Sequence, residues 1–271
     1  MTFETRGILA GNGTYPVALA QSLLSHGYRV VVAGIEGHFF STLPDGCGPF
    51  QLFPLGALGR SVRFFLSHGA KEIFLAGGVN RKNAWRLARP DIHALSLLPR
   101  TLSGKDDHLL RAVAEKISSL GAEVCDPGPY VAHLLAGEGL LAGPKPNAAV
   151  LKNIEVAWGA ALRIGRRDLG QAAIAYRGQV SGIEDSTGTN HLVAQAPGPG
   201  AVLAKVVKPR QDLRFDRPAV GPSTALLADA TGIDAIAVQA GGVLLIERQR
   251  LFNICDRTGI SLVGVPISDG A

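Results

Sequence analysis

RGILAGNGTYP, residues 6–16, is the stretch that decides the fold class of this 271-residue chain. It opens with a short apolar strand, and the glycine-rich turn that follows leads into a helical pattern over Val17–Ser25. The segment Tyr28–Ala33 is rich in valine and predicts a second strand. Strand, glycine turn, helix and strand form a βαβ unit, which implies a parallel sheet.

The same alternation continues along the chain. Helical patterns over Arg60–His68 and Asp106–Leu120 alternate with apolar strands at Glu72–Ala76 and Ala122–Cys125. Residues 126–147 then become rich in proline and glycine, which is typical of a domain boundary, and a second α/β series follows. We therefore predict an α/β protein of two domains, with a parallel sheet over residues 1–135, a hinge over 136–147 and a distinct α/β domain over 148–271.

The composition suits a folded protein with an anionic partner. Hydrophobic residues make up 46% of the chain and charged residues 18%, which argues against disorder. The formal net charge is +5, but no Lys/Arg tract is interleaved with aromatic residues. We therefore expect no nucleic-acid partner.

The cellular setting is suggested by patterns that the sequence lacks. The three cysteines lie far apart, which is typical of a reducing cytoplasm rather than of a disulfide framework. The first residues lack the pattern of a signal peptide, and no apolar run is long enough to span a bilayer. We expect a cytoplasmic protein whose contact with any membrane is peripheral.

The glycine-rich turn after the first strand is the first candidate binding site. Glycines there let the backbone approach a phosphate, and the start of the next helix favours negative charge. A dinucleotide site would have glycine in place of Pro16, and Glu36 could bind its ribose. A tight turn without a ligand is the structural alternative. The candidate residues are Gly11, Asn12, Gly13 and Thr14.

Further polar motifs fall beside predicted strands or at the start of a helix. The structural alternatives are turns, a helix cap and, within residues 184–190, a hairpin whose polar groups hydrogen-bond to one another. Glycines and hydroxyl, amide and charged groups at such positions also suit a nucleotide or a sugar. The candidates are Gly78, Asn80, Lys105, Asp106, Gln171, Gly188, Thr189 and Asn190.

The run from Lys208 to Gly221 is the most informative. In an extended segment Asp212, Arg214 and Asp216 would project to the same face. Two carboxylates with a guanidinium between them can hold a hard cation beside a phosphate. An edge strand with a ladder of ion pairs would not need the flanking prolines, so we favour a functional role. Lys208 and Gln211 belong to the same run.

Several kinds of active site are excluded by missing motifs. The seven histidines form no HxH or HExxH motif, which argues against a histidine-built dinuclear metallophosphatase. There is no GxxxxGK[ST] loop for P-loop hydrolysis and no GxSxG elbow for a serine nucleophile.

Taken together and in order, these motifs resemble one family, the UDP-2,3-diacylglucosamine pyrophosphatases of lipid A biosynthesis that are unrelated to calcineurin-like phosphoesterases. Each motif alone is weak, but their order along the chain is specific. The likeness extends over essentially the whole chain. It is carried by Gly7–Gly13 with Pro16, Gly104–Arg111, Asp168–Gln171, Gly188–Thr189 and Lys208–Gly221.

This resemblance implies a Rossmann-like N-terminal domain and a C-terminal α/β domain that carries the catalytic aspartate, with the substrate in a cleft between them. It implies hydrolysis of UDP-2,3-diacylglucosamine to UMP and 2,3-diacylglucosamine 1-phosphate. The cofactor would be Mg²⁺, held by the catalytic Asp216 with Asp212 as a second ligand. The protein would lie peripherally at the inner face of the inner membrane, and a homodimer is left open.

One departure from the family concerns the metal. Similar proteins have Gly-Thr-Asp where this chain has Gly188-Thr189-Asn190, so a negative charge is absent. An amide oxygen would hold a cation more weakly than a carboxylate.

Two other functions compete with hydrolysis. An NAD(P)-dependent oxidoreductase would use the glycine-rich turn and Glu36, although Pro16 counts against it. A non-catalytic protein that binds a nucleotide-sugar or a lipid would explain the glycines and the positive charge. It would leave the face formed by Asp212, Arg214 and Asp216 unexplained.

Overall fold

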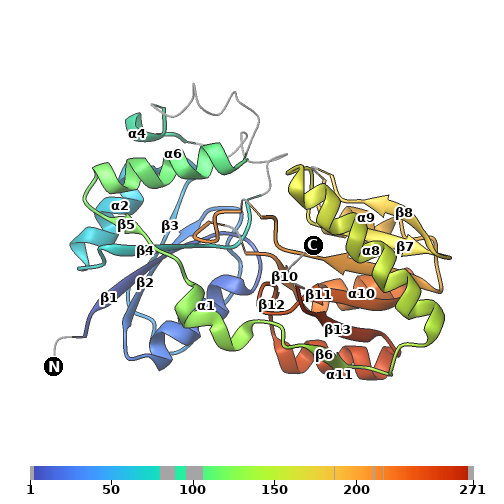
Figure 1. Ribbon diagram of the computed structural model, residues 1–271. Coiled ribbons are helices and arrows are strands. Elements are labelled where there is room, and N and C mark those ends of the chain that lie inside the picture. Colours follow the sequence, from blue (N-terminus) through green and yellow to red (C-terminus); the bar gives the residue numbers. More distant parts are fainter. Residues whose placement is uncertain are drawn as a thin grey trace. The chain divides into compact units, whose positions relative to one another are not determined.

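The computed structural model describes residues 3–79, 89–95, 106–185, 187–209, 211–215 and 217–267, with the backbone alone at 106–108. Its contacts divide these residues into two compact units (Figure 1). Unit 1 contains residues 3–131 and residues 212–215, and unit 2 contains the other described residues. Each unit has its own sheet.

Unit 1 is a parallel α/β unit. Its five-stranded sheet has the order β3-β2-β1-β4-β5, and every paired strand runs parallel to its neighbours. The elements are β1 (Thr5–Ala10), α1 (Tyr15–Ser25), β2 (Arg29–Ile35), β3 (Phe50–Phe53), α2 (Leu58–Ser67), β4 (Glu72–Ala76), α4 (Ile92–Leu95), α6 (Asp106–Ser119), β5 (Glu123–Val124) and α7 (Gly128–Val131).

The direction of winding reverses between β1 and β4, because β2 and β3 lie on one side of β1 while β4 and β5 lie on the other. The loops that follow β1 and β4 therefore meet at the topological switch point, where open α/β sheets bind ligands. A core packed between the sheet and helices α2 and α6 supports these strands, with Phe65, Ile73 and Ile117 almost completely buried.

The two loops at the switch point touch through their backbones. The Gly11 amide donates to the Ala76 carbonyl at 2.8 Å, and Asn12 and Gly78 exchange backbone hydrogen bonds at 2.7 and 3.0 Å. A Cβ on Gly11 would lie 2.4 Å from the Gly78 carbonyl oxygen. Only glycine allows this approach.

Unit 2 holds a six-stranded mixed sheet in the order β6-β13-β11-β9-β7-β8, together with the pair β10-β12. Strands β9, β11 and β13 are parallel, whereas β6, β7 and β8 pair antiparallel. The elements are η1 (Ala132–Leu134), β6 (Gly139–Ala142), α8 (Ala148–Arg166), β7 (Ala172–Tyr176), β8 (Gln179–Ile183), α9 (Thr189–Ala194), β9 (Ala201–Lys205), β10 (Ala219–Val220), α10 (Pro222–Ala230), β11 (Ile233–Gln239), β12 (Leu244–Leu245), α11 (Arg248–Thr258) and β13 (Ser261–Val265).

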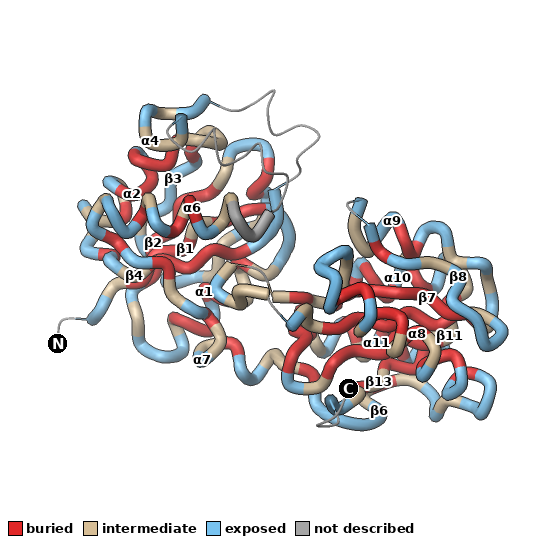
Figure 2. The backbone as a smooth tube through the Cα atoms, turned by 45° about the horizontal axis from the view of Figure 1, so that its top comes forward, coloured by how far each residue is buried: buried red, intermediate tan, exposed pale blue. Residues whose placement is uncertain are grey.

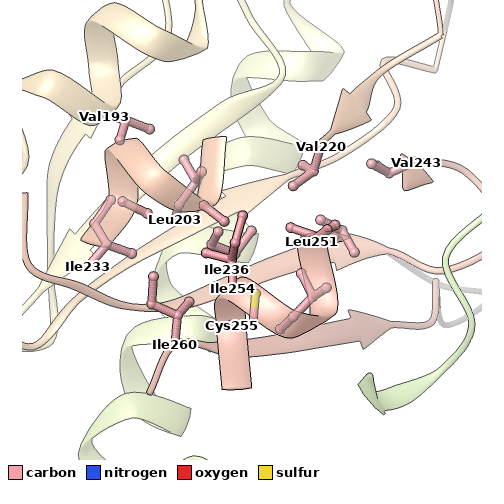
Figure 3. Packing of buried hydrophobic residues seen from close by; sticks show 14 of the residues in the cluster. Val193, Leu203, Val220, Ile233, Ile236, Val243, Leu251, Ile254, Cys255 and Ile260 are labelled. Carbon is pink, nitrogen blue, oxygen red and sulfur yellow. The ribbon is translucent and has the colours of Figure 1, made fainter. Parts of the chain in front are cut away.

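Both faces of the unit 2 sheet are covered, so its central strands are buried along their length (Figure 2). Helix α8 packs on one face, where alternate positions of β7, β9 and β11 carry small residues such as Ala173, Ala204 and Ala237. The opposite face meets α9, α10 and α11 through larger side chains, among them Leu203 and Ile236 (Figure 3).

The predicted fold class is confirmed: the protein has two α/β units, and the N-terminal one is a Rossmann-like parallel sheet. Two details differ from the sequence prediction. Residues 139–142, placed in the hinge, form β6, because they pair with β13. Residues 212–215, placed in the C-terminal domain, pack with unit 1, where Phe215 joins the core.

We expect Gly11→Ala to lower the free energy of unfolding of the chain by about 1–3 kcal/mol, since the new methyl group would clash with the Gly78 carbonyl. Gly78→Ala is the matched control, because a Cβ there meets nothing within 4 Å. The control should change the free energy by less than about 1 kcal/mol. Urea unfolding followed by circular dichroism measures both. Equal stability of the two variants would show that the loops are not in close contact.

Candidate functional site

The glycine-rich turn forms one polar site at the carboxyl edge of the unit 1 sheet. Residues 11–14 follow β1, and Gly78 follows β4 beside them. Pro16 stands in the first turn of α1, and the Ser41 hydroxyl donates to the Gly13 carbonyl at 3.2 Å. Backbone amides at the start of a helix attract phosphate. The structure thus brings together Gly11, Asn12, Gly13, Thr14 and Gly78.

A second polar site lies in unit 2, around the buried carboxylate of Glu184. Glu184 is 7% exposed and follows β8. Its Oε2 accepts a hydrogen bond from the Gln171 amide at 2.8 Å, and its Oε1 accepts one from the Thr189 hydroxyl. Glu184 therefore joins two of the predicted site residues, although the sequence gives it no role of its own within the polar run 184–190.

Lys208 is held beside the same strands by an ion pair. Its Nζ lies 2.7 Å from Asp168 Oδ1, and its amide donates to Gln211 Oε1 at 3.2 Å. Asp168 has a φ of +57°, a left-handed conformation that aspartate tolerates better than most residues. The Val206 amide donates to the Gln171 carbonyl at 2.9 Å, which places Gln171 close to the end of β9. Gln171, Thr189, Lys208 and Gln211 are thus gathered in unit 2.

Asn190 follows Thr189 in the first turn of α9, and its side chain is exposed. Gly188 immediately precedes this helix. At this helix start, the Thr189 hydroxyl is the group that donates to the buried Glu184 carboxylate.

Residues 212–215 form a turn and not the extended segment that the sequence predicted. The Phe215 amide donates to the Asp212 carbonyl at 3.0 Å, which closes the turn. The Arg214 guanidinium donates to both carboxylate oxygens of Asp212 and holds the pKa of Asp212 below its usual range. The two-bond pairing of these side chains stabilises the turn, whereas in an extended conformation they would only lie side by side.

The turn lines a pocket of unit 1 with a volume of about 670 Å³. Charged groups of both signs surround it, so the pocket has no uniform preference for an anion or a cation. The lining residues are Arg111, Ala114, Glu115, Ser118, Glu123, Val124, Asp212 and Arg214.

The predicted magnesium site stays a prediction, because its main ligand, Asp216, is not among the described residues. Among them no group of three His, Cys, Asp or Glu side chains could hold a metal ion. Both oxygens of Asp212 accept hydrogen bonds from Arg214, so a metal ion at Asp212 would compete with Arg214 for the carboxylate. Asp216, Asn80 and Lys105 lie outside the described residues, as does the side chain of Asp106.

A membrane-spanning segment would need a long apolar helix. In the part of the chain that the structure describes, no helix has the length and apolar character to cross a membrane.

The chain is a two-domain α/β protein. Its first unit is Rossmann-like and carries the paired glycine loops, and its second unit has a mixed sheet with a polar site that contains a lysine. These features suit a phosphorylated ligand. Comparison with known families narrows this class. The model of the LpxI N-terminal domain matches residues 5–134, and that of the LpxI C-terminal domain matches residues 137–263. The chain belongs to the LpxI family, as its motifs predicted.

A curated relative agrees with this assignment over nearly the full length. The UDP-2,3-diacylglucosamine pyrophosphatase LpxI of Caulobacter vibrioides is 28% identical over 273 residues, which cover 96% of each chain.

Similar solved structures are more distant. The CobK precorrin-6A reductase is 13% identical with a TM-score of 0.33, and covers 98% of this chain and 89% of its own. An L-amino acid ligase from Bacillus licheniformis is 10% identical with a TM-score of 0.25, and covers 69% and 40%. Neither likeness is close enough to support a functional argument.

Glu184→Ala should lower the free energy of unfolding by about 1–3 kcal/mol, because the Gln171 amide and the Thr189 hydroxyl lose their common acceptor. Glu184→Gln keeps an acceptor oxygen for the amide and offers an NH₂ group to the hydroxyl, so we expect a loss below about 1 kcal/mol. Urea titration of both variants measures the difference. An equal loss in the two would mean that the charge of Glu184 stabilises unit 2, and not its hydrogen bonds.

Proposed function

We propose that this protein is an enzyme, a pyrophosphatase that hydrolyses UDP-2,3-diacylglucosamine to UMP and 2,3-diacylglucosamine 1-phosphate in lipid A biosynthesis. The observation that carries the proposal is the match of both LpxI domains, together with a relative of that activity aligned over 96% of the chain. The phosphate-type loops at the switch point of unit 1 agree with a substrate that contains a pyrophosphate.

The substrate's two phosphates carry negative charge that repels an incoming water molecule, so the site must neutralise that charge. The amide groups of Gly13 and Thr14, at the start of α1, suit one phosphate. Lys208 and Arg214 supply fixed positive charge, and each is oriented by an aspartate that accepts its hydrogen bonds. Water adds to one phosphorus, and the bridging P–O bond breaks to release both products.

The essential carboxylate in this proposal is Asp216, the catalytic aspartate that the resemblance to the family implies. We also propose that the reaction depends on Mg²⁺, which when bound would offset phosphate charge. The sequence predicts Asp216 and Asp212 as its ligands. Asp212 could bind a cation only if the Arg214 guanidinium moved away from it. Asn190 adds no negative charge to such a site.

The protein would meet its substrate at the cytoplasmic face of the inner membrane as a peripheral protein. Two acyl chains keep the substrate in the bilayer, so the enzyme must come to the surface. The net charge of +5 suits an anionic leaflet. Whether two copies act together stays a prediction.

UMP release from UDP-2,3-diacylglucosamine in detergent micelles, measured by chromatography, tests the proposal. We expect the wild type to release UMP with Mg²⁺ and to stop in EDTA, and we expect Asp216→Ala to lose at least about 100-fold in rate. Asp229→Ala, which changes an exposed aspartate at the end of α10, is the matched control and should keep wild-type activity.

Substrate that is bound but stays intact would overturn hydrolysis in favour of a binding protein. Saturable NADH binding without UMP release would support the oxidoreductase, for which Glu36 stands exposed directly after β2. Full activity of Asp216→Ala would exclude Asp216 as the essential carboxylate.

A further inference from the structure

The turn at residues 212–215 is braced by its own side chains. Asp212 is largely buried, with a side chain 16% exposed, whereas the Arg214 side chain is 44% exposed. The Arg214 Nε donates to Asp212 Oδ1 at 3.0 Å, and Nη2 donates to Oδ2 at 2.8 Å. This two-bond fork is the strongest common pairing of an arginine with a carboxylate.

The same carboxylate is engaged from other directions as well. The backbone amide of Arg214 donates to Asp212 Oδ1 at 3.2 Å, so this oxygen accepts from two groups of one residue. The Arg111 Nε of helix α6 lies 3.9 Å from Oδ2. A divalent cation at Asp212 would need these oxygen lone pairs as ligands and would be repelled by two guanidinium groups.

The turn is also attached to the core of unit 1. The Phe215 ring packs against the cluster that contains Val62, Phe65 and Ile117, and the Arg214 guanidinium lies 4.8 Å above that ring. The ion pair, the cation–π contact and the partly buried ring together hold residues 212–215 against unit 1.

We propose that Asp212 is a positioning residue and not a metal ligand: it neutralises and orients Arg214, and with Phe215 it fixes the backbone that leads into Asp216. Of the five N–H donors of the guanidinium, the fork uses two, which leaves three to face a phosphate. The inference rests on the proposed function for the identity of the ligand of Arg214. Whether Asp212 is a positioning residue or a metal ligand can be tested without that function.

A double-mutant cycle separates the two roles, because residues that act through one another are not additive. The variants are Asp212→Ala, Arg214→Ala and the double variant, with Asp229→Ala as the control. We expect each single change at the turn to lower kcat/KM for UMP release by about 10- to 100-fold. The double variant should be no slower than Arg214→Ala alone.

A metal readout makes the test independent of activity. Titration of the substrate-free protein with Mn²⁺, followed by the electron paramagnetic resonance of the free ion, compares the wild type with Asp212→Ala and Asp212→Asn. If Asp212 is a positioning residue, the Mn²⁺ affinity and the Mg²⁺ concentration for half-maximal rate should change less than about twofold. Removal of a ligand would lower the Mn²⁺ affinity and raise the Mg²⁺ concentration for half-maximal rate, each by at least about tenfold.

Independent, multiplicative losses in the cycle together with a tenfold higher Mg²⁺ requirement would overturn the proposal. If Asp212→Ala does not fold, as judged by circular dichroism, the isosteric Asp212→Asn carries the same comparison. If the wild type releases no UMP, the proposed function fails, whereas the Mn²⁺ titration still decides whether Asp212 binds metal.

Discussion

The close backbone contact between the loops after β1 and β4 is the constraint on which unit 1 depends. Gly11 and Gly78 lie so near each other that a side chain on Gly11 would overlap a carbonyl oxygen. The contact closes the switch point of the parallel sheet and holds residues 11–14 at the start of α1. The contact uses the amides of Gly11 and Asn12, so a ligand at this turn would meet the amides of Gly13 and Thr14 at the start of α1. One glycine-rich turn thus serves both the fold and the candidate site.

Unit 2 is organised by a different constraint, a sheet that is buried on both faces. Its central strands alternate small residues toward α8 with larger ones toward α9, α10 and α11. The long helix α8 starts at Asn147, whose side chain accepts a hydrogen bond from the Val150 amide at 3.0 Å. This rigid layer fixes the ends of β7, β8 and β9, where Gln171, Glu184 and Lys208 lie.

Charged groups at the candidate sites are paired within each unit. Glu184 accepts from Gln171 and Thr189, Asp168 pairs with Lys208, and Asp212 pairs with Arg214. Each carboxylate thereby orients groups that the sequence analysis assigned to the substrate. Charged groups that are already oriented need little free energy to reorganise during a reaction. Such preorganised groups can therefore stabilise the charge on a phosphate.

Local patterns in the sequence determined the α/β class, the glycine turn after the first strand and the order of the family's motifs, because these depend on neighbouring residues alone. The sequence could not show that Glu184 links Gln171 to Thr189, that residues 139–142 complete the sheet as β6, or that residues 212–215 turn and pack with unit 1. Those features depend on partners distant in the chain, and on Arg214 folding back onto Asp212. An alternating Asp-x-Arg pattern suits an extended strand and a closed turn equally, and the observed turn combines the Arg214–Asp212 pair with packing of Phe215 against the core of unit 1.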